Sequence, residues 1–70
     1  MEKNKMDKRL LTIKEVGIYL NMNIRTLYSY VQKGIIPHYR LGKGRNGAIR
    51  FDLNLIDEWI DANRNGYKEV

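Results

Sequence analysis

The stretch that decides the fold is residues 12–34, TIKEVGIYLNMNIRTLYSYVQKG. Apolar residues recur in it twice with the spacing i, i+3, i+4 and i+7, which is the period of an amphipathic helix. The spacing predicts helices over residues 13–20 and 24–33, with Asn21-Met22-Asn23 between them. Two short helices joined by a turn of about three residues are the helix-turn-helix pattern.

Residues at the ends of both runs favour these boundaries. Thr12 and Glu15 have the spacing of a capping box, in which the side chain at each position bonds the backbone of the other. Asn23 is a good cap for the second helix, and Gly34 stands where a helix ends in a left-handed residue. Gly17 lies on the apolar side of the first helix, which allows a second helix to approach closely.

The next residues predict a β-hairpin, which we call the wing. Two alternating segments, 38–41 and 48–51, flank the glycine-rich tip GKGRNG at 42–47. Alternation predicts one face turned to the core, formed by Tyr39, Leu41, Ile49 and Phe51. It predicts an opposite, outward face formed by His38, Arg40 and Arg50.

A third helix follows the wing. Asp52 is its cap, and the apolar spacing predicts a helix over 53–62. Its apolar stripe comprises Leu53, Ile56 and Ile60, widened by Leu55 and Trp59.

These elements predict a mainly α domain with a small β-hairpin, a winged helix-turn-helix in the order helix-turn-helix-hairpin-helix. The domain spans residues 10–62, between a flexible arm at 1–9 and a frayed tail at 63–70. A chain of 70 residues has room for one small domain.

Composition excludes several classes of function. The chain has no cysteine, which rules out disulfides, thiolate zinc sites and thiol nucleophiles, and its single histidine, His38, cannot build a multi-histidine metal site. No nucleophile–base constellation is visible, so we expect neither an enzyme nor a cofactor, metal or small-molecule substrate. No signal peptide or membrane-length apolar run is present, so we expect a cytoplasmic protein.

Charge is segregated along the chain. Thirteen bases and eight acids give a net charge of +5. Residues 16–51 hold six bases and no acid, whereas residues 52–61 hold four acids and no base. A region without carboxylates suits a polyanion, because each acid would repel nearby phosphates, and the helix-turn-helix pattern points to double-stranded DNA as that polyanion.

The candidate DNA contacts lie on the second helix and the wing. Those on the helix are Arg25, Thr26, Tyr28, Ser29, Gln32 and Lys33. Those on the wing are Arg40, Lys43, Arg45, Asn46 and Arg50. The arginines are otherwise ordinary solvated charges, Tyr28 is either a core residue or a phosphate contact, and Tyr30 is the better core candidate.

Two segments together resemble a known family: LLTIKEVGIYLNMNIRTLYSYVQKGIIPHYRLG at 10–42 and AIRFDLNLIDEWI at 48–60. The sequence features that carry this resemblance are LTIKEV, the tyrosines at 28 and 30, Lys33-Gly34, Ile36-Pro37, Arg40-Leu41-Gly42, Arg50-Phe51 and the tryptophan of IDEWI. The chain resembles the excisionase-like helix-turn-helix family, within the wider MerR-like winged-helix group.

The resemblance implies a recombination directionality factor of a phage or mobile element. Such proteins bind and bend attachment-site DNA and bias an integrase toward excision without cutting. The implied contacts are Arg25, Thr26, Tyr28 and Ser29, then Arg40 and the wing. The implied partners are DNA, an integrase and further copies bound cooperatively, and the implied location is the bacterial nucleoid. Ser29 replaces a frequent base of the family, and the wing tip is longer than usual.

Two alternatives remain open. A small phage-type transcription regulator has the same domain. A protein-interaction module would instead use the acidic third helix, through Asp57, Glu58 and Asp61.

Overall fold

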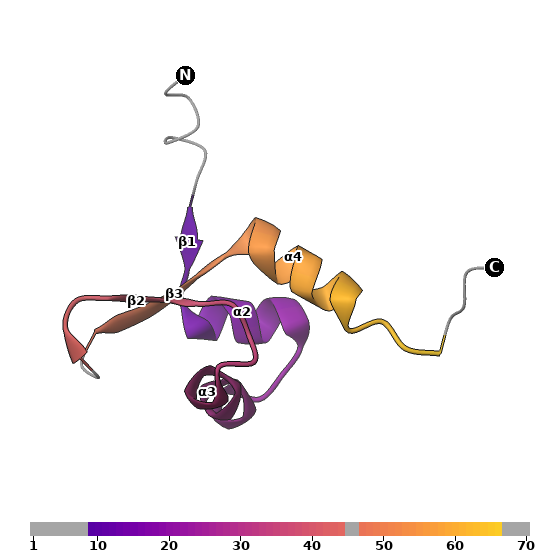
Figure 1. Cartoon of the computed structure of the whole chain (residues 1–70), viewed down its shortest axis with the longest axis horizontal. Helices are drawn as coiled ribbons and strands as arrows, with labels where there is room; N and C mark the ends of the chain where they lie inside the picture. The colour runs from indigo at the N-terminus through magenta and orange to yellow at the C-terminus, as the bar shows by residue number, and fades with distance from the viewer. Residues whose placement is uncertain (1–8, 45–46, 67–70) are drawn as a thin grey trace, which may run out of the picture.

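The computed structural model describes residues 9–44 and 47–66. Predictions for residues 1–8, for Arg45 and Asn46 in the wing tip, and for residues 67–70 lie outside this part. Figure 1 shows the elements in chain order: β1 (Leu10–Leu11), α2 (Ile13–Leu20), α3 (Ile24–Lys33), β2 (Tyr39–Leu41), β3 (Ala48–Asp52) and α4 (Leu53–Ala62). The winged helix-turn-helix predicted from the sequence is confirmed, and all three helices have the predicted boundaries.

Local side-chain bonds explain why the helices begin where they do. The Glu15 backbone donates to Thr12 Oγ1 over 3.1 Å, and the Thr12 backbone donates to Glu15 Oε1 over 2.9 Å, which completes the capping box. Asn23 Oδ1 accepts from the Arg25 backbone over 2.8 Å at the start of α3. Gly34 ends α3 in the left-handed region, with φ of 70°.

The turn between α2 and α3 is folded tightly against Gly17. The Met22 backbone N–H donates to the Gly17 carbonyl over 2.9 Å. A Cβ on Gly17 would lie 3.2 Å from the Met22 carbonyl oxygen, closer than most such contacts. The closest approach at this glycine is thus made by the turn, while Leu27 and Ile24 of α3 would lie 3.6 and 3.7 Å from the same Cβ, at ordinary contact distance.

The described sheet has three strands rather than the two of a hairpin. Its order is β1-β3-β2, and both pairings are antiparallel. The sequence gives no sign of β1, because two residues are too few to show alternation. Leu11 pairs with Phe51, so β1 anchors the entry to α2 on the central strand.

The pairing register contradicts the predicted faces of the wing. Tyr39 lies opposite Arg50, and Arg40 lies opposite Ile49. Directly opposed residues of an antiparallel pair share a face, so Arg40 lies on the face of Ile49, and Arg50 lies with Tyr39 on the other. Accordingly Tyr39 and Leu41, predicted as core, are 36% and 50% exposed.

The core lies between the inner face of the sheet and the helices. Its buried side chains are Val16, Leu27, Val31, Ile36, Phe51 and Ile56. Ile49, Tyr30 and Trp59 pack against this cluster, as predicted. Leu53 and Ile60 are exposed instead of buried, since α4 turns Ile56 and Trp59 toward the core. In Figure 1, β2 and β3 run away from the helices as a two-stranded ribbon.

Candidate nucleic-acid interface

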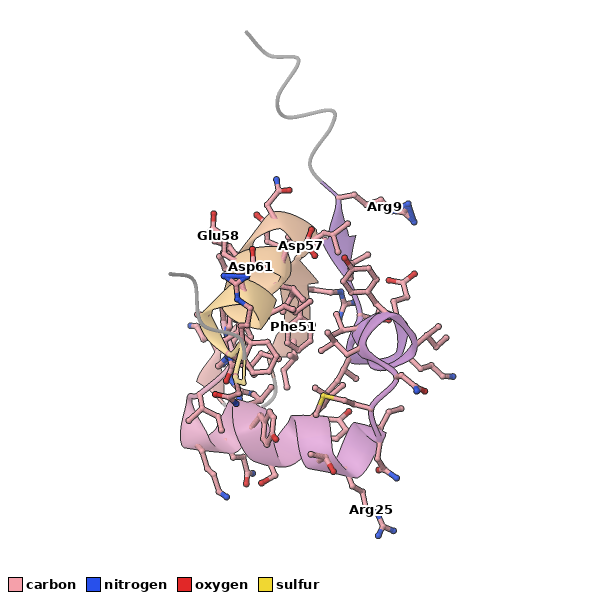
Figure 2. The ribbon with its side chains drawn as sticks, turned by 90° about the vertical axis from the view of Figure 1, so that its right-hand side faces the viewer. Arg9, Arg25, Phe51, Asp57, Glu58 and Asp61 are labelled. Carbon is pink, nitrogen blue, oxygen red and sulfur yellow. The ribbon has the colours of Figure 1, made fainter. Side chains whose placement is uncertain are left out.

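The outer face of α3 carries the polar side chains that the sequence analysis selected. Leu27 and Val31 are buried on its inner face. Arg25, Gln32 and Lys33 are exposed on the other side, and Figure 2 shows Arg25 directed away from the body of the protein. The alternation of buried and exposed positions follows the helical period, so the core contacts of α3 leave this face uncovered.

Side chains between these extremes complete the face. Thr26 and Ser29 are half-buried. Tyr28 is 48% exposed, so it is not a core residue. Tyr30 packs against the core and meets Trp59 edge to face, with ring centroids 6.2 Å apart.

The wing divides its arginines between two faces. Arg40 lies on the face of Ile49 and Phe51, which is the face turned to α2 and α3, and its side chain is exposed. Arg50 is half-buried on the opposite face, where its Nη1 donates to the Ile49 carbonyl over 2.9 Å. Lys43 is exposed at the tip. The structure thus places Arg40, but not Arg50, on the same side of the sheet as α3.

A surface hollow beside the start of α3 was missed by the sequence analysis. Its lining residues are Lys14, Gly17, Ile18, Asn21, Met22, Asn23 and Ile24. Lys14 is exposed there, and Ile18 is 80% exposed. Lys14 stands on the polar side of the first predicted helix, but its closeness to α3 depends on how the turn folds.

The acidic side chains of α4 lie on the other side of the molecule from Arg25. Figure 2 shows Asp57, Glu58 and Asp61 on α4, with Phe51 between them and the α3 helix that carries Arg25. The segregation of charge along the sequence is therefore also a segregation in space. A polyanion that approaches α3 therefore lies closer to basic side chains than to the acidic side chains of α4.

One of these acids has a structural partner. The Tyr19 hydroxyl on α2 donates a hydrogen bond to Asp57 Oδ1 on α4. This bond, followed by partial burial and the carboxylate charge, raises the pKa of Tyr19 above its ordinary value. Asp57 thus ties α4 to α2.

Residues 9–44 and 47–66 contain no group of three His, Cys, Asp or Glu placed to hold a metal ion. Within the same ranges, no helix is both long and apolar enough to cross a membrane. His38 Nδ1 lies 2.9 Å from the Ile36 carbonyl oxygen, so its ring is engaged with the backbone.

Comparison with known protein families identifies the domain. Residues 10–64, more than half of the chain, match a protein-family model described as a helix-turn-helix domain. Neither the curated proteins nor the solved structures yield a significant match.

Proposed function

Since the chain belongs to the helix-turn-helix domain family, which includes excisionase-like DNA-binding proteins, we propose that it is a sequence-specific DNA-binding accessory protein of the excisionase type. The observation that carries the proposal is the uncovered basic and polar face of α3, from Arg25 to Lys33. The DNA-binding domain comprises residues 10–62, in a winged arrangement of the MerR-like kind. The protein acts on DNA in the bacterial nucleoid, without catalysis.

In this proposal α3 lies in the major groove. Arg25 bonds guanine in bidentate fashion, and Gln32 bonds adenine. Thr26 and Ser29 donate to base edges or phosphates, while Tyr28 and Lys33 hold phosphates. These roles agree with the exposure of each side chain, since Arg25 and Gln32 are exposed and Thr26 and Ser29 are half-buried.

The wing supplies the second set of contacts. Arg40 and Lys43 follow the phosphates or the adjoining minor groove, together with Arg45 and Asn46 of the tip. We do not include Arg50 among the proposed contacts, because the register places it on the opposite face of the wing from Arg40. Lys14 is a further phosphate contact in this proposal, because it is exposed and borders the hollow at the start of α3.

The test begins with selection of binding sites from random duplexes, followed by fluorescence anisotropy on the selected site. If about five phosphates are neutralised, log K falls against log salt with a slope of about −4 to −5. Arg25→Ala weakens binding and relaxes the base preference, whereas Lys43→Ala weakens binding to every duplex alike. Glu58→Gln, on the acidic side of α4, is the matched control and leaves the affinity for the selected site essentially unchanged. A flat salt response, or no enriched site, contradicts sequence-specific DNA binding.

The excisionase role needs its own experiment. We expect the protein to protect and bend the attachment region of its parent element, in several cooperatively bound copies, and to stimulate excision by the integrase encoded beside it. A small transcription regulator with the same domain protects a promoter instead and leaves excision unchanged. Protection and excision assays on the same DNA separate the two roles.

A protein-interaction module acting through Asp57, Glu58 and Asp61 is the remaining alternative. It predicts that addition of DNA leaves the amide resonances of α3 and the wing unmoved. The bond from Tyr19 gives one of these three acids a role within the fold, which weakens the support for a docking surface.

A further inference from the structure

Residues 34–38 connect the end of α3 to β2, and so link the two candidate DNA-binding elements along the chain. It begins with a firm end to α3, where the Gly34 N–H donates to the Val31 carbonyl and the Ile35 N–H donates to the Tyr30 carbonyl, each over 3.0 Å. Ile36 follows and is only 2% exposed. We call residues 34–38 the joint.

One side chain of α4 reaches this joint from the far end of the chain. The Trp59 indole Nε1 donates to the Ile35 carbonyl oxygen over 2.7 Å. The same ring meets Tyr30 of α3 at 64° between the ring planes. Trp59 therefore contacts both the last turn of α3 and the backbone that leads from it into β2.

A hydrogen bond to a carbonyl restrains the rotation of the peptide group that carries it. The Ile35–Ile36 peptide is held on one side by the indole and on the other by the buried Ile36 side chain. The helix that carries Trp59 is itself fixed to α2 through the bond between Tyr19 and Asp57. Through Trp59 and α4, the joint is therefore connected to both α2 and α3.

We propose that Trp59 is a positioning residue that sets the angle of the wing relative to α3, so that both elements meet DNA at once. The proposal rests on the proposed function, and it deepens it by assigning α4 a part in binding without any DNA contact. A prealigned wing binds without first being ordered, which is the source of affinity in preorganised interfaces. With the indole bond removed, the joint rotates more freely, and contacts from the wing lose their effect.

The test uses Trp59→Phe in the full chain, which keeps an aromatic ring against Tyr30 and removes the donor. Ile60→Ala, at the adjacent and exposed position of α4, is the matched control because it keeps the indole bond. Residual dipolar couplings of the amides in β2 and β3, measured against those of α3, report the wing angle without DNA. We expect Trp59→Phe to change these couplings and Ile60→Ala to leave them unchanged.

Binding to the selected duplex gives the second readout. Removal of a charged contact costs about tenfold in affinity in an aligned interface, so we expect about that loss for Arg40→Ala in the wild-type background. In the Trp59→Phe background, Arg40→Ala costs less than about twofold, since the contact it removes is already poorly formed. Loss of overall stability alone would leave this ratio unchanged at a temperature where both proteins are folded.

Unchanged couplings, or an equal effect of Arg40→Ala in both backgrounds, overturn the proposal. If circular dichroism shows that Trp59→Phe does not fold, Trp59→Met replaces it, because methionine fills irregular apolar space without donating. If the wild-type chain binds no DNA, the proposed function fails, and the couplings still decide whether Trp59 sets the wing angle.

Discussion

The two arginines of the wing provide a sharp test of the strand register. Arg40 and Arg50 carry the same charge and lie on paired strands, so the sequence alone gives them equal standing. The register places Arg40 on the α3 side of the sheet and Arg50 on the opposite side. We therefore expect Arg40→Ala to weaken DNA binding strongly and Arg50→Ala to leave it nearly unchanged.

The magnitudes follow from the surroundings of each side chain. Arg40 is exposed, so its whole charge is available to a phosphate, and loss of such a contact costs about 1.5 kcal/mol or about tenfold in affinity. Arg50 donates to the Ile49 carbonyl, so its removal costs about 0.5–1.5 kcal/mol of folding stability instead. Its remaining influence on DNA acts through solvent, where salt at 0.1 M screens charges beyond about 10 Å, and we expect less than about a twofold effect.

Anisotropy titrations on the selected duplex, repeated at several salt concentrations, make the comparison. Arg40→Ala reduces the magnitude of the salt slope by about 0.9, the value for one phosphate. Arg50→Ala leaves the slope unchanged and lowers only the urea midpoint. Each variant removes one positive charge, so a purely long-range effect would weaken binding equally. Equal losses, or a larger loss for Arg50→Ala, would refute the assignment of faces.

Three further outcomes test the core, a cap and the contact between α2 and α4. Phe51→Ala removes the largest fully buried side chain of the described residues and costs about 3–5 kcal/mol of folding free energy, which is close to the whole stability of so small a domain. We therefore expect circular dichroism to show an unfolded chain. Phe51→Leu costs less than about 1.5 kcal/mol, so this variant remains folded. Asn23→Ala lowers the unfolding free energy by about 1 kcal/mol in urea titrations, through loss of the bond to the Arg25 backbone. The raised pKa of Tyr19 favours the neutral phenol in the folded state, so its stabilising effect is present below about pH 10 and lost as the pH rises through the folded pKa. The urea midpoint then falls above about pH 10 in the wild type and less in Tyr19→Phe.

The sequence predicted the helices well because their ends depend on neighbouring residues. Thr12 with Glu15, Asn23 and Asp52 each bond a backbone group two or three positions away. Such caps act wherever the chain places them, and the three boundaries they define are confirmed. The exposed face of α3 follows from the same local period.

Contacts between distant residues could not be predicted in this way. Alternation divides the side chains of each strand between two faces. Which face of one strand lies beside which face of the other depends on the pairing register, and the number of residues in the tip sets that register. Leu41 pairs with Ala48, so the six-residue tip reverses the expected relation between the strands. The bond from Trp59 to Ile35 spans 24 positions and depends on the packed position of α4. The hollow beside Lys14 likewise exists only once the turn has folded.

The geometry of α3 separates DNA specificity from stability. Leu27 and Val31 hold the helix to the core, while Arg25 and Gln32 are exposed on the other side. Surface substitutions away from such anchors usually change stability by less than about 0.5 kcal/mol. Under the proposed function, we therefore expect changes at Arg25 and Gln32 to alter which bases are bound while the fold, the wing angle and the acidic side of α4 stay the same. A domain of this kind can acquire a new binding site through a few exposed positions of one helix, without compensating changes in its core.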